Sequence, residues 1–346
     1  MTDQPRTIEG GRTTAAAEPS SVVSLPTTRA LLREAAEQAR LAPSVHNTQP
    51  WRFGLHDGAL EIYRDPARQL RVIDPDGRQL MISCGCAVFN ARVALAAAGY
   101  EAVVSELGDP PRPDLVARIT VGPPTDSWLP ISALQPWISR RRSNRREYFG
   151  DQVPVEVSYA LTQAAVAEGA ELVELASLAD RILVSQLTRH ADSDQLLDPA
   201  YRAEIRAWTT DDPRRPDGVQ AMSVPRVSGE SSDELPVRDF DSRGMGWLPT
   251  RTRSAANQCL FLLGSAEDDP AGWLRTGQAL QRLWLQATRQ GYAISLFTQS
   301  VENPESRQRL RALLRLSGYP HLVLRVGHAP ATPASRRREL AQLLVD

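Results

Sequence analysis

Hydrophobic and polar positions recur along the chain with two periods, and each period predicts one type of element. Between Thr27 and Leu41 apolar side chains recur every three or four residues, as on one buried face of a helix, until Pro43 ends the pattern. Two strand-like stretches follow, and the Asp57-Gly58 pair between them is typical of a tight hairpin turn. The first part of the chain is predicted to form helices over 27–41 and 77–98 and strands over 51–56, 59–64, 101–107 and 115–121.

The second part begins after a Pro-rich stretch over 123–130, which we interpret as a linker. Its predicted helices are 132–146, 154–168, 177–190, 199–208, 273–290 and 304–315, and its predicted strands are 170–175, 259–264 and 321–326. Helices and strands are mixed without a regular βαβ alternation, which favours an α+β fold over a doubly wound sheet. No GxGxxG motif follows a predicted strand, so a Rossmann-type dinucleotide site is not expected.

Two segments lack any pattern that would build a core. Residues 1–26 are mostly Thr, Ala, Ser, Gly and Pro with scattered charge, and we expect a disordered tail. Residues 209–252 are rich in Pro, Gly, Ser, Arg and Asp, and a structureless stretch of this length is typical of a lid or a disordered insert. Apolar residues inside it could hold a lid against a ligand, namely Met222, Phe240, Met245 and Trp247.

Charge excludes several classes of function. The chain has 346 residues with a net charge of -1, so no overall field draws it to nucleic acid or to an anionic membrane, and an anion site must be local. All 40 basic residues are Arg, because the sequence contains no Lys. This excludes a P-loop and a Schiff-base lysine. It leaves guanidinium groups, which suit the geometry of phosphate.

Cysteine usage indicates a reducing, cytoplasmic environment. The three cysteines, Cys84, Cys86 and Cys259, are too few for a disulfide framework. We interpret Cys84 and Cys86 as small core residues, and no His, Cys and carboxylate grouping has the spacing of a metal site. The N-terminus lacks the apolar region of a signal peptide, and we expect no run long and apolar enough to span a bilayer.

The most informative string is Pro43-Ser44-Val45-His46-Asn47-Thr48-Gln49-Pro50-Trp51. Its polar side chains are suited to present hydrogen-bonding groups to a ligand. The alternative is an ordinary turn that ends a helix before a buried strand.

A second string, Arg140-Arg141-Arg142-Ser143-Asn144-Arg145-Arg146, supplies positive charge. On the helix predicted over 132–146, Arg141 and Arg145 would share a face, as would Arg142 and Arg146, and a bound anion would relieve their repulsion. The alternative is a solvated basic face or a patch for an acidic partner.

Together the two strings resemble the nitroreductase-like superfamily of FMN flavoproteins. Members of that family show an Arg-Arg-Ser-x-Arg string followed by a Pro-Ser-x-x-Asn-x-Gln-Pro-Trp string, whereas here the second comes first. The segment Gly291-Tyr292-Ala293-Ile294-Ser295 and the tail from Gly327-His328-Ala329-Pro330 to Ser335-Arg336-Arg337-Arg338 are also similar to family segments.

In the family, the flavin lies between two subunits, and each subunit gives one of the two strings. The resemblance therefore implies a dimer fused into one chain, as in the Acg-type branch. Its first half would be 27–122, and its second half would be 131–346, including a lid-like insert over 209–252. One composite site would be complete and the other lost.

The resemblance also implies site residues, all of them for FMN and none catalytic, since the chemistry takes place on the flavin. They are Pro43, Ser44, Val45, Asn47, Gln49, Arg141, Arg142, Ser143, Arg145, Ser295, Leu296, Arg336 and Arg337. Arg141, with Arg336 or Arg337, would hold the phosphate, and Arg145 would face the pyrimidine edge. Gln49 is expected to orient the loop, and His46 to be a satisfied loop histidine rather than a proton donor.

The implied activity is ping-pong hydride transfer from NAD(P)H through FMN to nitroaromatic or quinone-type acceptors. The partners would be small molecules, with neither nucleic acid nor membrane, and the fused chain would be a monomer with further oligomerisation open. The alternative is a protein that stores FMN under a closed lid with little turnover. A third option is a dehydrogenase that acts on a peptide or metabolite.

Overall fold

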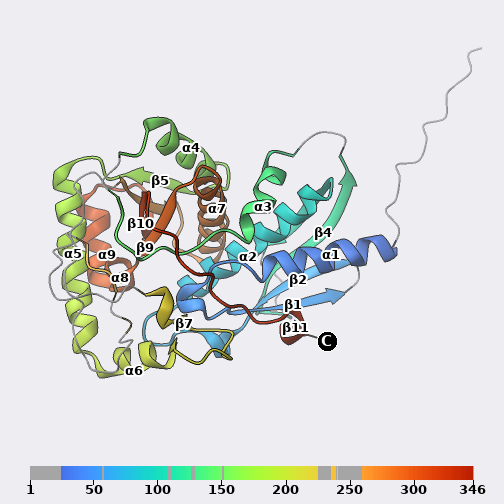
Figure 1. Ribbon diagram of the computed structural model, residues 1–346, viewed down its shortest axis with the longest axis horizontal. Coiled ribbons are helices and arrows are strands. Elements are labelled where there is room, and N and C mark those ends of the chain that lie inside the picture. The colour runs from blue at the N-terminus through green and yellow to red at the C-terminus, as the bar shows by residue number, and fades with distance from the viewer. Residues whose placement is uncertain are drawn as a thin grey trace, which may run out of the picture.

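Two sheets, one mixed and one antiparallel, form the two sides of the molecule, and two long helices lie between them (Figure 1). The computed structural model describes residues 25–56, 58–106, 111–125, 129–149, 152–224, 235–238, 240 and 259–345. The central helices are α2 (Arg78–Ala97) and α7 (Pro270–Arg289), each of 20 residues. The predicted α+β class is confirmed.

The first sheet has the order β11-β1-β2-β4-β3 and packs against α2 and against α1 (Leu25–Ala39). Its strands are β1 (Trp51–His56), β2 (Ala59–Arg64), β3 (Tyr100–Glu106), β4 (Leu115–Pro124) and the terminal β11 (Leu344–Val345). The predicted hairpin is confirmed, because Trp51 pairs with Arg64 and His56 with Ala59.

The second sheet has the order β5-β8-β10-β9. Its strands are β5 (Glu171–Glu174), β8 (Cys259–Ser265), β9 (Ala293–Phe297) and β10 (Tyr319–Gly327). Its helices besides α7 are α4 (Val155–Val166), α5 (Leu178–Leu197), α6 (Pro199–Ala207), α8 (Gln299–Glu302) and α9 (Pro304–Leu313). The predicted helix over 177–190 is therefore too short, since α5 continues to Leu197.

The two sheets repeat one topology. When the strands of each sheet are numbered in chain order, the second lies between the first and the fourth, and the third lies at the edge beside the fourth. The first sheet has β11 in addition, beside its first strand. In each half, a 20-residue helix is followed by a glycine of positive φ, Gly99 at 84° and Gly291 at 85°. A tyrosine comes next in both halves: Tyr100 begins β3, and Tyr292 immediately precedes β9.

The C-terminal arm crosses from the second half to the first. After β10 the chain returns beside the loop at 43–49, and Phe53 and Gly54 of β1 pair in parallel with Leu344 and Val345 of β11 (Figure 1). The sequence did not predict this strand, because two residues are too few to show a pattern.

The prediction of a helix over 132–146 is wrong. The 3₁₀ helix η3 (Pro130–Leu134) leads into α3 (Gln135–Ile138), and the chain is then irregular through the Arg string. Asn144 explains the difference, because its backbone N–H donates to the carbonyl of Ile294 at 3.0 Å and its side chain donates to the carbonyl of Pro330 at 2.8 Å. These partners compete with helical bonds, and a helix would have crowded five arginines.

The predicted structureless stretch over 209–252 is partly wrong. Its first limb contains β6 (Thr209–Thr210), which pairs with β7 (Val219–Gln220), and the 3₁₀ helix η4 (Ala221–Ser223). Further on, Leu235, Val237, Arg238 and Phe240 are buried. Residues 225–234, 239 and 241–252 lie outside the described residues, with Met245 and Trp247 among them, as does the tail prediction for 1–24.

Helix α2 corrects the expectation about bilayer-spanning runs. By length and composition it could cross a membrane, but 89% of its most apolar window is buried inside the protein. It packs against α1, α7 and the first sheet, so its apolar surface is used by the core.

Candidate functional site

The loop at 43–49 is held in an unusual backbone conformation. It contains the 3₁₀ turn η1 (Val45–Asn47), and His46, Asn47 and Gln49 have φ values of 44°, 56° and 49°. The hydroxyl of Ser44 accepts from the backbone of Gln49 at 2.9 Å, and the backbone of Val45 donates to Ser83 of α2 at 3.1 Å. Non-glycine residues at positive φ store backbone strain, which concentrates at functional sites.

The Arg string faces this loop from the second half. Ser143 forms an isolated parallel bridge with Ile294 of β9, so the backbone here is extended. Arg141 and Arg145 contact different aromatic rings. The guanidinium of Arg141 lies 4.7 Å from the ring centroid of Trp284, and that of Arg145 lies 4.9 Å from the ring centroid of Phe240.

Two adjoining cavities lie between the loop and the string. The first has a cavity volume of about 80 Å³ and the second one of about 160 Å³. Both are lined by the same four residues, Pro43, Ser44, Ser143 and Arg145, so they form one bent site. The composite arrangement expected from the two strings is therefore present in the geometry.

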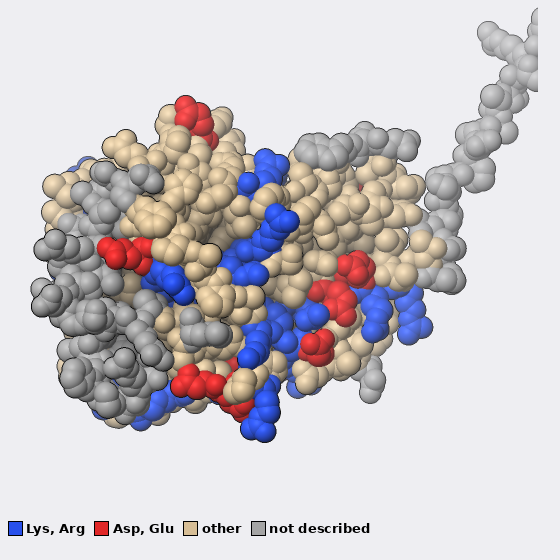
Figure 2. All heavy atoms as spheres, in the orientation of Figure 1, with Lys and Arg blue, Asp and Glu red and all other residues tan. Residues whose placement is uncertain are grey.

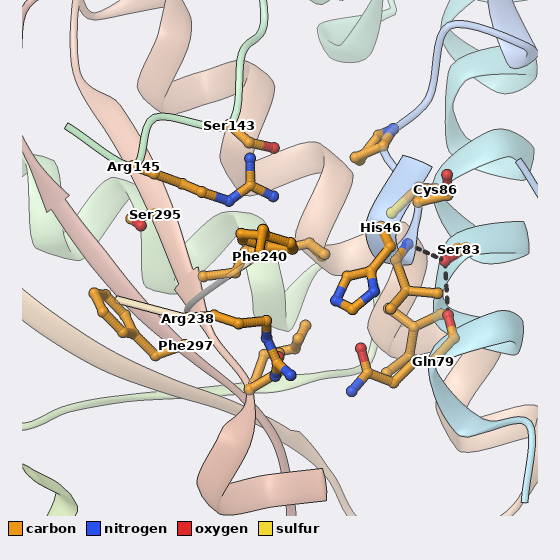
Figure 3. A pocket seen from close by; sticks show the side chains of 18 of the residues that line it. His46, Gln79, Ser83, Cys86, Ser143, Arg145, Arg238, Phe240, Ser295 and Phe297 are labelled. Atoms are coloured by element: carbon orange, nitrogen blue, oxygen red, sulfur yellow. Dashed lines mark hydrogen bonds between the residues drawn. The ribbon is translucent and has the colours of Figure 1, made fainter. Parts of the chain in front are cut away.

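The first cavity is largely apolar and carries two cations (Figure 3). Its apolar lining includes Val45, Ile82, Val237, Phe240, Leu280, Leu296, Phe297 and Leu322. Burial, with Arg238 nearby, lowers the pKa of Arg145 to about 10. Arg238 is paired with Glu302 of α8 at 2.6 Å, and the ring of Phe240 lies between Arg145 and His46.

His46 turns its ring into the first cavity (Figure 3). It is buried, its ring meets that of Phe240 edge-on with centroids 5.3 Å apart, and Nδ1 has no hydrogen-bond partner in the described part of the chain. Burial and the charge of Arg238 lower its pKa to about 3. The imidazole is therefore neutral at pH 7, and it is not the fully hydrogen-bonded loop histidine that we expected.

The second cavity is polar and cationic. Among the described residues that line it are four arginines, Arg141, Arg142, Arg145 and Arg337, and no Asp or Glu. Basic side chains form a band down the middle of this face, where the C-terminal arm crosses between the halves (Figures 1 and 2).

Arg141 is the most informative residue of the second cavity. It is only 4% exposed, and within the described ranges its Nε and Nη1 have no hydrogen-bond partner. Burial, with Arg337 nearby, lowers its pKa to about 9. Arg337 is fixed by its hydrogen bond to Oδ1 of Asn47 at 2.8 Å. A buried cation without a carboxylate partner is costly unless an anion binds beside it.

The donor set fits a flavin mononucleotide. Guanidinium groups without acidic neighbours suit a phosphate, and Ser143 adds a hydroxyl at the junction of the two cavities. The first cavity, apolar with a few polar groups, is typical of a site for a flat ring system. No group of three His, Cys, Asp or Glu side chains among the residues the structure describes could hold a metal ion.

The structure brings most of the predicted residues to this site. The residues on the cavity walls are Pro43, Ser44, Val45, Asn47, Arg141, Arg142, Ser143, Arg145, Ser295, Leu296 and Arg337. Gln49 is buried behind the loop and donates to the carbonyl of Pro216 at 3.0 Å. Arg336 is exposed and lines neither cavity.

The lining residues that sequence reasoning missed include Gln79, Gln220, Ser223 and Arg238. Gln220, Ser223 and Arg238 lie in the insert over 209–252, whose composition gave no signal for individual polar residues. Gln79 lies in the first turn of α2 and donates to Glu302 at 3.0 Å.

The position on α7 that corresponds to Cys86 on α2 carries a glutamine whose side chain is hydrogen-bonded on both sides. Cys86, the ninth residue of α2, lines the first cavity, and the ninth residue of α7 is Gln278. Gln278 donates to Glu106 at the end of β3 at 2.5 Å and accepts from Arg92 at 2.8 Å. Polar side chains thus bond to one another at this position, whereas Cys86 lines a cavity.

Comparisons with known proteins identify the family. No protein-family model matches the chain. The chain is 34% identical over 308 residues to a Mycobacterium tuberculosis protein named "Putative NAD(P)H nitroreductase Rv3131", covering 88% of both chains. It is 28% identical over 325 residues to the Acg protein of the same organism, which carries the same type of name, covering 90% of this chain and 95% of Acg.

A solved structure shows a weaker likeness, and the family assignment does not depend on it. The FMN-dependent nitroreductase NfnB of Mycobacterium smegmatis, in complex with NADPH, aligns with 61% of this chain and 96% of its own at 16% identity and a TM-score of 0.38. The assignment follows from the relative that shares a third of its residues over nearly the whole chain: the protein belongs to the nitroreductase-like superfamily of FMN proteins, together with Rv3131 and Acg.

Proposed function

We propose that the protein binds one FMN in the bent site and transfers hydride from NAD(P)H to nitroaromatic or quinone-type acceptors. The observation that supports this best is Arg141, a buried cation whose Nε and Nη1 have no partner among the described residues, in a cavity that adjoins a largely apolar one and whose described lining contains no Asp or Glu. The names of Rv3131 and Acg, which assign them to NAD(P)H nitroreductases, agree with it.

Each side chain of the site would have a definite part. Bound FMN would supply the hydride chemistry, in a ping-pong cycle with the two substrates. Arg141 and Arg337 would hold the phosphate, and the charge of Arg145 at the junction would stabilise negative charge that develops in the first cavity. The apolar side chains that line the first cavity, Val45 and Leu322 among them, would exclude water from that charge.

We further infer that the chain is a fused dimer with a single flavin. The shared strand order of the two sheets, the two equal central helices and the glycines at 99 and 291 support this inference. So does the hydrogen bond of Gln278 to Glu106. On this basis the functional unit is one chain, and a monomer carries one complete site.

The test is the anaerobic visible spectrum of the purified protein before and after addition of NADPH, with flavin and chain quantified separately. We expect flavin bands at one FMN per chain that bleach with NADPH and return with a quinone. Two flavins per chain would contradict the single-site inference. A colourless protein that takes up no FMN would contradict the proposed function.

A second candidate, an FMN-holding protein with little turnover, is favoured by Phe240. Its ring lies in the first cavity between Arg145 and His46, and Arg238 fixes the same segment to Glu302 (Figure 3). If this segment keeps nicotinamides out, flavin bands persist with NADPH in the wild type and bleach in Phe240→Ala. Equal bleaching of both proteins would favour the reductase.

A further inference from the structure

Residues 215–224 of the insert, called the limb from here on, form a wall of the second cavity. Val219, Gln220 and Ser223 line it together with Arg141. Gly218 sets the path of the limb, because its φ is 77° and a Cβ there would lie 3.0 Å from the carbonyl oxygen of Trp208. The segment expected to be a lid or a disordered insert is therefore, in this part, built into the site.

The limb is bonded to the loop at 43–49. The side chain of Asn47 donates to the carbonyl of Gly218 at 3.1 Å, and the backbone N–H of Gly218 donates to the carbonyl of Asn47 at 3.2 Å. Asn47 also accepts from Arg337 at 2.8 Å. The limb, the loop and the C-terminal arm are thus joined through one asparagine at the edge of the second cavity.

Two side chains of the limb are buried donors without partners. Gln220 and Ser223 are each 7% exposed, and Nε2 of Gln220 and Oγ of Ser223 have no hydrogen-bond partner among the described residues. Buried polar groups are nearly always hydrogen-bonded, so an unpaired one needs an explanation. Here two such groups face the same acid-free cavity as the unpaired nitrogens of Arg141.

We propose that Gln220 and Ser223 donate hydrogen bonds to the same phosphate monoester that Arg141 binds. An anion with three acceptor oxygens satisfies all three side chains at once, whereas a neutral apolar ligand satisfies none of them. The insert is then a part of the anion site in addition to any role as a cover. Only the naming of the phosphate as that of FMN rests on the proposed function.

This arrangement couples ligand binding to the position of the limb. A phosphate that bonds to Gln220 and Ser223 stabilises the docked limb, because a ligand shifts an equilibrium toward the state that it binds better. Occupancy by a phosphate should therefore protect the amides of 215–224 from hydrogen exchange. Riboflavin, which lacks the phosphate, should protect them less.

The first experiment compares FMN with riboflavin. Flavin is removed from the purified full chain, and the dissociation constants of both flavins are measured by fluorescence quenching for the wild type, Gln220→Ala, Ser223→Ala and the control Arg214→Ala. Arg214 has a side chain that is 90% exposed, and its partner within the described ranges is Asp212 at the surface. Both test variants should bind FMN about tenfold more weakly and riboflavin within twofold of the wild type. The control should change neither constant.

The second experiment uses inorganic phosphate as the probe, with hydrogen exchange of 215–224 as the readout. Phosphate should protect the limb in the wild type and less in Ser223→Ala, a variant that removes an unpaired hydroxyl and should fold as stably as the wild type. Equal loss of FMN and riboflavin affinity, unchanged FMN affinity, or no protection by phosphate would overturn the proposal. A wild type that binds neither flavin, yet is protected by phosphate, would refute the proposed function and leave this inference standing.

Discussion

Gly85 of α2 and Gly277 of α7 meet backbone to backbone. A Cβ built on Gly277 would lie 2.0 Å from the carbonyl oxygen of Ile82, and one built on Gly85 would lie 2.1 Å from that of Leu274. Each glycine is the eighth residue of its 20-residue helix. The contact therefore relates the two halves symmetrically, and it brings the helices so close that side chains are excluded at the crossing.

Replacing Gly277 by alanine should destabilise the protein by about 3 kcal/mol or more, because the new methyl group meets backbone that cannot rotate away. The sign of this change in the free energy of unfolding is informative, since alanine within a helix is otherwise favoured over glycine by about 1 kcal/mol. Urea unfolding gives the difference. Arg289→Ala, at the exposed end of the same helix, should change stability by less than about 0.5 kcal/mol. An unchanged Gly277→Ala protein would refute the close crossing.

The sequence was sufficient for elements whose pattern is local. The hairpin of β1 and β2 follows from alternation around Asp57-Gly58, and α2 from its apolar length and the closing Gly99. The internal repeat was also visible, because Gly99-Tyr100 and Gly291-Tyr292 follow the two long helical patterns in the same way. Comparing these two segments would have shown the repeated topology directly.

The sequence failed where distant contacts set the backbone. The Arg string has the composition of a helix, but Asn144 bonds to Ile294 and Pro330, far along the chain. The segment over 209–252 has the composition of a loop, and contacts with distant residues, such as the pairing of Gly218 with Asn47, fix part of it. Site residues on such segments carry no local signal.

Replacing Arg141 by methionine should raise the stability of the flavin-free protein while it abolishes tight FMN binding. The unpaired buried charge costs free energy without a ligand, and its removal should gain about 1–3 kcal/mol. Urea unfolding of the flavin-free chain and an FMN titration measure the two effects. The exposed neighbour Arg140, which lines neither cavity, is the control, and Arg140→Met should leave FMN binding intact. A flavin-free Arg141→Met protein less stable than the wild type would refute the argument.

Stability should fall as the pH falls from 6.5 toward 3, and His321 should account for a measurable share. Burial, then the charge of Arg307, lowers its pKa to about 3, so in this range the unfolded chain binds a proton that the folded one does not. The loss is at most about 1.4 kcal/mol per pH unit for each such histidine. Between pH 7 and 4.5, His321→Gln should therefore lose about 2–3 kcal/mol less than the wild type. If urea unfolding shows that the wild type and His321→Gln lose the same stability between the two pH values, His321 does not have this role.

The thiols should be inert in the native protein. All three cysteines are buried, and burial raises the pKa of Cys86 to about 12, although its side chain is on the wall of the first cavity. Iodoacetamide at pH 8 should label none of them before unfolding and three after it, as counted by mass spectrometry. Rapid native labelling of Cys86 would show that the first cavity opens to solvent more widely than this arrangement allows.

The pair of Arg238 and Glu302 should control access to the first cavity. Both side chains are buried and 2.6 Å apart, and burial alone would raise the pKa of Glu302, but the charge of Arg238 lowers it. Glu302→Gln leaves the charge of Arg238 buried beside the hydroxyls of Tyr201 and Thr298, with Asp192 as an acidic neighbour, a loss of about 3–5 kcal/mol. The segment 235–240 should then undock, exchange its amides faster and admit FMN more rapidly.

A variant that removes both charges distinguishes the loss of the Arg238–Glu302 ion pair from a general loss of stability. In the double variant Arg238→Leu with Glu302→Leu both charges of the pair are removed, so global stability should be closer to that of the wild type than in Glu302→Gln. Phe240, however, would be held by packing alone, and FMN association should stay fast in stopped-flow measurements. If association in both variants is as slow as in the wild type, the ion pair does not hold the segment, and Phe240 must be kept in the cavity by its contacts with Arg145 and His46.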